Sequence, residues 1–236
     1  MKRILALLLA FLLLLPTVLA EAETKDEPPE EIQGMLAAAL AEYERQGEKK
    51  LKKNNEYTTW YYNDQRQIGW CGVYVIWCAA QGGVPLLKEA QILDFVEGKV
   101  SEDADYEPLT EIPDVFVMKE GHVGRIRNGY QQLARYTDIP KPGYQIVYGR
   151  IGGTPIIHTA MVESVTEIED GVWELTTLEG NVGSRLKHYC FRYTLTPKKK
   201  HKNYTAVPKD ERTRDDVSYK LIDDNWYITG FGITWK

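Results

Sequence analysis

Apolar residues follow a helical period in the first part of the chain. Between residues 32 and 50 they recur every three to four positions, which predicts an amphipathic helix with acids at its start and lysines at its end. A second, shorter helix is predicted over residues 86–98, where Gly98 is a suitable end. Residues 71–81, CGVYVIWCAAQ, are apolar on all sides and stop at two glycines. Although valine and isoleucine prefer strands, this length and this stop favour a buried helix.

The pattern changes after residue 100, where short apolar runs alternate with turn residues. Such runs predict antiparallel strands, which we expect at residues 144–149, 155–165, 171–180, 187–195 and 226–235. A short helix is expected near residues 130–136. The long, charged stretch 197–220 is expected to form an insertion loop. Helices followed by an antiparallel sheet predict the α+β class.

The first twenty residues have the layout of a secretory signal peptide. Two cations precede an apolar run from Ile4 to Leu15, and a proline and the small residue Ala20 follow it. A transmembrane anchor is the alternative, but the run is shorter than the roughly 20 residues that a span needs. We expect cleavage after Ala20 and a secreted protein without a stable membrane anchor. A flexible lead-in over residues 21–31 and one domain over residues 32–236 should follow.

Charge and cysteine content restrict the class of protein further. The net charge is −5 and no long basic tract occurs, so nucleic acid is not an expected partner. Three cysteines are an odd number for an exported chain, so one thiol is free unless it pairs between molecules. On a helix, Cys71 and Cys78 lie about 10 Å apart, too far for a disulfide. No zinc-ligand spacing occurs, so neither a metal nor a cofactor is expected. We expect a monomer.

Cys71 has two interpretations. At the first turn of a helix, unpaired backbone amides favour the thiolate, which is the reactive form of cysteine. In an apolar segment, however, a cysteine is often a core residue, which is what we expect of Cys78 and Cys190. The segment alone does not decide between the two, so the decision depends on partners elsewhere in the chain.

His158 is the histidine that falls within an apolar strand pattern. It is either a hydrogen-bonded core residue or a general base for Cys71. The remaining histidines have polar or charged neighbours and are expected at the surface; these are His122, His188 and His201.

The hairpin that follows His158 carries two further polar candidates. It turns at residues 170–171, Asp-Gly, and strand parity then places His158, Glu179 and Asn181 on one face. A regular two-residue hairpin would leave Glu179 about 13 Å from His158 along the strand. Contact between them therefore needs a bulge or a longer loop, and a solvated strand-end acid is the alternative for Glu179.

Together these residues have the parts of an activated cysteine. A thiolate is paired with an imidazole, and a third polar group orients the imidazole through its other nitrogen. An amide side chain before the cysteine, Gln65 or Gln67, would stabilise an oxyanion. Substrate contact is expected from Tyr62 and Trp70.

The order of the motifs resembles the CHAP family (cysteine- and histidine-dependent amidohydrolases/peptidases). The matching segments run from about residue 55 to residue 234: NNEYTTWY, WCGVYVIWCAAQGGV, PKPGYQIVYG, HTAMVESV, LEGN and ITGFG. The resemblance implies a papain-like fold with Cys71 as nucleophile and His158 as its base. It further implies that Glu179 orients His158 and that Asn181 supports the triad or the oxyanion. The implied activity is cleavage of amide bonds in bacterial peptidoglycan.

Two positions depart from the family pattern. Tyr144 stands where an aspartate is usual, and within YYNDQRQIG only Asp64 is acidic, which is too few oxygen ligands for calcium. The leading hypothesis is a secreted, cell-wall-associated peptidoglycan hydrolase that works through a thioester acyl-enzyme. The alternatives are a non-catalytic CHAP-like wall-binding protein and an exported cysteine protease that acts on proteins.

Overall fold

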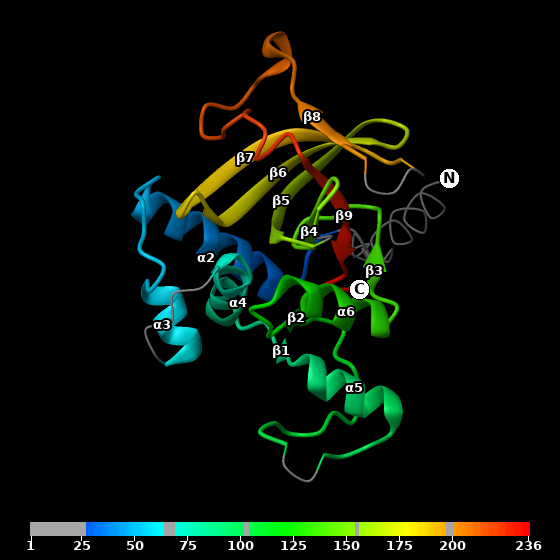
Figure 1. Ribbon diagram of the computed structural model, residues 1–236. Coiled ribbons are helices and arrows are strands. Elements are labelled where there is room, and N and C mark those ends of the chain that lie inside the picture. Colours follow the sequence, from blue (N-terminus) through cyan, green and yellow to red (C-terminus); the bar gives the residue numbers. More distant parts are fainter. Residues whose placement is uncertain (1–26, 64–68, 102–103, 154–155, 197–200) are drawn as a thin grey trace, which may run out of the picture.

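The computed structural model describes residues 27–63, 69–101, 104–153, 156–196 and 201–236. The predicted signal peptide and the two glutamines, Gln65 and Gln67, therefore lie outside the described residues. Helices lie beside an antiparallel sheet (Figure 1), so the predicted α+β class is confirmed.

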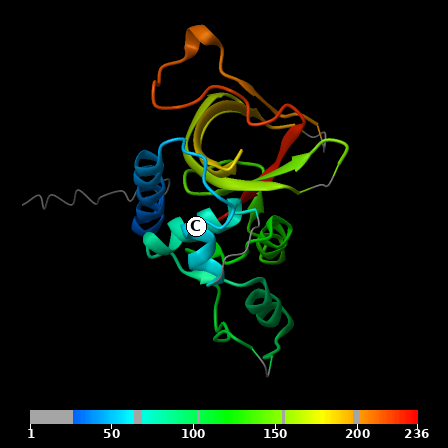
Figure 2. The same cartoon turned by 60° about the vertical axis from the view of Figure 1, so that its left-hand side comes forward.

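Seven described strands form the main sheet, in the order β3-β9-β4-β5-β6-β7-β8, and each pairs antiparallel with its neighbours. The five predicted strands are confirmed with small shifts at their ends, as β4 (Gln145–Arg150), β5 (His158–Glu169), β6 (Val172–Val182), β7 (Arg185–Thr194) and β9 (Trp226–Gly232). The sequence pattern does not predict the short edge strands β3 (Tyr136–Thr137) and β8 (Tyr204–Ala206). Figure 2 shows the long strands curling into an arc above the helices.

Helix α2 (Glu30–Gln46) has the predicted amphipathic face, but its ends differ from the prediction. It begins inside the expected lead-in and stops before the expected end at residue 50. The reason for the early stop is Gly47, which takes a φ of +56° and donates its backbone N–H to the carbonyl of Tyr43.

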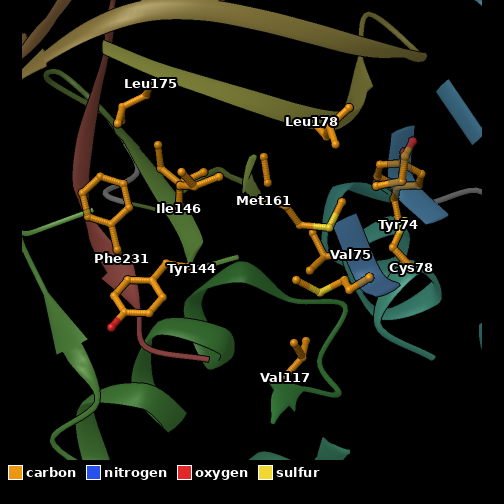
Figure 3. Packing of buried hydrophobic residues seen from close by; sticks show 14 of the residues in the cluster. Tyr74, Val75, Cys78, Val117, Tyr144, Ile146, Met161, Leu175, Leu178 and Phe231 are labelled. Carbon is orange, nitrogen blue, oxygen red and sulfur yellow. The ribbon is translucent and has the colours of Figure 1, made fainter. Parts of the chain in front are cut away.

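Helix α4 (Cys71–Gln81) is the predicted buried helix. It crosses α2 so closely that a Cβ at Gly82 would lie 2.3 Å from the backbone nitrogen of Met35. Only a residue without a side chain permits this approach. Side chains of α4 and of the sheet meet in one core, shown in Figure 3, in which Tyr74, Val75 and Cys78 lie near Met161 and Leu178. Cys78 and Cys190 are buried free thiols, as predicted.

The remaining helices are shorter. α3 (Glu56–Tyr62) stands where the sequence predicts only a polar connection, and the side chain of Asn55 caps it by accepting hydrogen bonds from two backbone amides. α5 (Glu89–Glu97) has Gly98 as its C-cap, as predicted, but it begins three residues after the predicted start because Leu86 and Leu87 form a short strand. The helix expected near residues 130–136 is wrong: the structure has α6 (Val123–Gln132) and then β3.

A small second sheet lies beside these helices. In it β1 (Leu86–Leu87) and β2 (Val117–Met118) pair in parallel. Within the described part of the chain, no helix is long and apolar enough to cross a membrane.

The insertion, described from residue 201 onward, is held to the sheet at two places. Its first part forms β8 on the edge of β7, followed by the 3-10 helix η1 (Lys209–Glu211). Its last part returns to β7 through a bridge between Ser218 and Tyr189. The predicted loop is thus partly regular structure.

The returning insertion covers His188, so the prediction that this histidine lies at the surface is wrong. His188 is fully buried, and its Nε2 lies 2.8 Å from Oε2 of Glu163. Arg214 of the insertion donates to the same carboxylate oxygen at 3.2 Å. We call Glu163, His188 and Arg214 the insertion clasp. His122 and His201 are exposed, as predicted.

Candidate active site

Cys71 is the first residue of α4, so the unpaired amides of the helix start lie next to its thiol. Trp70 precedes it and is fully buried, with its ring 5.5 Å from that of Tyr57 and 6.5 Å from that of Tyr74. The expectation that Trp70 contacts substrate is therefore wrong. Its indole instead anchors the start of the helix in the core and so fixes the position of Cys71, which is itself 6% exposed.

Two β-bulges bring Glu179 within reach of His158. At the turn, Glu169 lies opposite Val172, as in a regular hairpin with a two-residue loop. Residues 163 and 168 of β5 are then skipped in the pairing, and each skip shifts the register by one residue. When the pairing beyond both bulges is extended to His158, Glu179 lies two residues from the position directly opposite His158. In a regular hairpin it would lie four residues from that position. Diagonal neighbours of this kind, about 7 Å apart, are within reach of long side chains.

The three side chains form one continuous hydrogen-bonded chain. Nε2 of His158 lies 2.6 Å from Oε2 of Glu179. The ring also hydrogen-bonds to Cys71, and because Glu179 occupies Nε2, Nδ1 is the nitrogen left for the thiol. His158 is 4% exposed and Glu179 is 1% exposed, so the chain lies in a site of low dielectric.

The surroundings favour a thiolate–imidazolium pair. Burial raises the pKa of Cys71, but the charge and hydrogen bond of His158 and the backbone amides of Thr159 and Gly72 outweigh it, and the net pKa is lowered. Burial likewise disfavours the imidazolium of His158, but Cys71 and Glu179 outweigh it and raise its pKa to about 10. Both shifts stabilise the charged forms of the pair.

The sequence interpretation overlooks two hydroxyl groups that bind Glu179. Tyr148 donates to Oε1 of Glu179 at 2.9 Å, and Thr177 donates to the same oxygen at 2.8 Å. Strand parity contains a signal for Thr177, which precedes Glu179 by two residues on β6. The place of Tyr148 opposite His158 depends on the register of β4 and β5, which the sequence pattern does not give.

Aromatic and apolar side chains enclose the pair. The ring of Trp226 lies 5.2 Å from the ring of His158, and that of Tyr148 lies 5.6 Å from it. On the thiol side, Cys71 clusters with Val123 and Val147. These neighbours give the pair apolar surroundings, which strengthens the charge interactions in the site.

Asn181 occupies a different place from Glu179. It has a φ of +64° at a further irregularity of β6, and its amide nitrogen lies 3.6 Å from where a Cβ of Gly69 would be. Its side chain thus approaches the segment before Cys71, whereas Glu179 contacts the imidazole. Of the two residues that the sequence leaves open as the third member, Glu179 is the one bonded to His158.

The other predicted site residues lie at the margin of this constellation. The hydroxyl of Tyr62 lies over Gly121, in the segment that packs on Gly72 at the start of α4. Tyr62 is partly exposed, and its contact with substrate stays a prediction. No group of three His, Cys, Asp or Glu residues suited to a metal ion occurs among the described residues.

Comparison with known proteins adds no relative. The chain matches no protein-family model, no curated protein and no solved structure. The geometry of Cys71, His158 and Glu179 and the motifs of the sequence are therefore what indicates a function.

Proposed function

We propose that the protein is a secreted cysteine hydrolase with a papain-like arrangement that cleaves amide bonds of bacterial peptidoglycan. The observation that carries the proposal is the buried Cys71–His158–Glu179 chain, in which each residue comes from a different part of the fold. A core cysteine and a core histidine would have no reason to meet at a helix start with a carboxyl group hydrogen-bonded to the imidazole.

The geometry supports a two-step mechanism. The thiolate of Cys71 attacks the amide carbonyl, and the oxyanion that forms lies beside the unpaired amides at the start of α4. The imidazolium of His158 gives its Nδ1 proton to the leaving amine, and a thioester remains on Cys71. His158, now neutral, takes a proton from water, and the hydroxide attacks the thioester. The carboxylic acid product leaves, and the thiolate–imidazolium pair is restored.

The choice of substrate depends on the resemblance to the CHAP family and on the signal peptide. The cysteine helix and LEGN support a peptidoglycan hydrolase, and the amino-terminal segment supports export to the compartment where the cell wall lies. Gln65 or Gln67 and Asn181 are proposed to support the oxyanion, since Asn181 faces the segment that leads to Cys71.

Digestion of purified peptidoglycan tests the proposal. The wild-type protein is expected to release soluble muropeptides, and mass spectrometry names the cleaved bond. Cys71→Ala should abolish the release while the fold persists, and Cys78→Ala serves as the matched control because that thiol lies seven residues further along the same helix. Casein is incubated in parallel. Hydrolysis of casein without release of muropeptides would assign the protein to the proteases that act on proteins.

One observation favours a second candidate, a non-catalytic relative that binds the cell wall. Tyr144, in the place of the usual aspartate, is nearly buried and packs edge-on against Trp235 with ring centroids 5.9 Å apart. It stabilises the fold and offers no carboxylate. Retention of the protein on sacculi together with intact muropeptides would support this candidate.

A further inference from the structure

The carboxyl group of Glu179 lies out of contact with solvent. It is 1% exposed, and no arginine or lysine bonds to it among the described residues. Burial of a polar group without hydrogen bonds is very costly. Glu179 therefore needs hydrogen-bond partners that replace its lost water.

Among the described residues, three groups hydrogen-bond to it, and they are divided between its two oxygens. Oε2 bonds to His158, at 2.6 Å. Oε1 accepts from both Tyr148, at 2.9 Å, and Thr177, at 2.8 Å. With two hydroxyl groups on one oxygen, the plane of the carboxylate is fixed and the other oxygen can point only at the imidazole.

The donors are themselves firmly placed. Tyr148 is fully buried, and its strand position is opposite His158. Thr177 is fully buried on the same strand and the same face as Glu179. Neither hydroxyl can be replaced by solvent when it is removed, so each loss leaves the carboxylate short of one donor.

We propose that Tyr148 and Thr177 are positioning residues that keep the carboxyl group of Glu179 aimed at His158, and thereby keep the thiol of Cys71 in its reactive form. The inference deepens the proposed function and depends on it only for the identity of the reactive thiol. With Glu179 aimed at Nε2, its hydrogen bond stabilises the imidazolium that holds the proton of Cys71 on Nδ1. When the carboxyl group turns away, the imidazolium loses that support and the proton returns to sulfur.

Alkylation of Cys71 by iodoacetamide as a function of pH tests the inference without any substrate. The rate is followed by mass spectrometry of the peptide that contains Cys71, so modification of Cys78 or Cys190 is not counted. We expect Tyr148→Phe and Thr177→Val each to lower the rate near pH 6 about tenfold, because each removes one hydrogen bond to a charged group. The midpoint of the alkylation profile should move to higher pH in both.

Matched variants separate positioning from a general loss of packing. Thr177→Ser keeps the hydroxyl and loses the methyl group, so it should alkylate at the wild-type rate. Thr177→Val keeps the methyl group and loses the hydroxyl, so it should be slow. Tyr204→Phe is the control for Tyr148→Phe, because Tyr204 is also a buried tyrosine near Tyr148 but its hydroxyl binds the carbonyl of Asp223. It should leave the profile unchanged.

The outcomes also separate this inference from the proposed function. The inference is overturned if Thr177→Val alkylates at the wild-type rate, or if Thr177→Ser and Thr177→Val are equally slow. The two Thr177 variants test the inference even if Tyr148→Phe fails to fold. If the alkylation rates follow the expected order but no muropeptide is released by the wild type, the proposed function fails and the positioning role stands.

Discussion

Three cysteines of one chain lie in three different electrostatic environments. Burial raises the pKa of Cys78 well above its ordinary value and raises that of Cys190 to about 11. Cys71 is also buried, yet its pKa is lowered because His158 lies beside it. The difference is made by neighbours that are remote in sequence, so residue type and burial alone do not identify the reactive thiol.

The two shifts at Cys71 and His158 predict the pH dependence of hydrolysis. The productive pair exists between the lowered pKa of Cys71 and the pKa of His158 at about 10. Activity should rise at acid pH as the thiol loses its proton and fall as the pH passes through about 10, where the imidazolium loses its own. Initial rates of muropeptide release across pH 4 to 11 check this. An alkaline limb near the ordinary histidine value of about 6.5 would contradict the pairing.

At the scale of elements, the start of α4 depends on one indole. Trp70 is fully buried between Tyr57 and Tyr74, so Trp70→Ala should lower the free energy of unfolding by about 3–5 kcal/mol. Trp60, on α3, is 45% exposed, and Trp60→Ala should change the free energy of unfolding by roughly 0.5 kcal/mol or less. Urea unfolding followed by circular dichroism gives both values. Equal losses in the two variants would show that Trp70 does not anchor the helix.

The insertion clasp should make stability depend on pH. Burial raises the pKa of Glu163, but His188 and Arg214 outweigh it and lower the pKa below its ordinary 4.5. A carboxylate with a lowered pKa stabilises the fold above its unfolded value, and this contribution is lost as the pH falls through the folded value. Glu163→Gln should therefore cost about 1–3 kcal/mol at pH 7 and progressively less below pH 4.5.

Chemical denaturation at several pH values measures the contribution of the clasp. Glu167→Gln, an exposed position on the same strand, is the control and should show no such trend. A cost for Glu163→Gln that stays constant from pH 7 to pH 3 would mean that the charge of Glu163 does not hold the insertion.

The elements that the sequence predicts are those specified by local signals. The five long strands and α4 follow from apolar periodicity and from glycine or Asp-Gly stops within a few residues. The burial of His188 has no local signal, because the covering insertion returns from thirty residues further along the chain. The cap of α3 at Asn55 is local, but it lies in a polar stretch that apolar periodicity does not register.

The candidate site likewise has features that the sequence predicts and features that it does not. Parity alone places His158 and Glu179 on one face, which is why the pair is visible in the sequence. Their contact depends on the unpaired residues of β5, and no sequence pattern in that strand predicts where a bulge will form. Thr177 follows from the same parity argument, whereas the place of Tyr148 depends on the register of β4 and β5. The burial of Trp70 depends on packing against α3 and α4.

At the scale of the molecule, the three thiols are distributed through the interior without a cross-link. Cys71, Cys78 and Cys190 are all free and buried, so the curled sheet and its helices are held by packing, hydrogen bonds and ion pairs and not by a disulfide. We expect 5 mM dithiothreitol to leave the melting temperature unchanged, measured by differential scanning fluorimetry, because no disulfide restrains the unfolded chain. A drop of several degrees would reveal an intermolecular bridge. Mild peroxide should instead remove activity, since a thiolate oxidises first.

The paired bulges of β5 set a rule for how this hairpin can change in length. Residues 163 and 168 are the unpaired, extra residues of β5, so deleting either one would remove a bulge and leave the pairs on both sides of it unchanged, with His158 still near its carboxylate. Deleting a paired residue of β6 between the turn and Glu179 would instead shift the two strands by one position and turn Glu179 away from the face of His158. A library of single-codon deletions across the hairpin should therefore retain activity at residues 163 and 168 and lose it at the paired positions of β6.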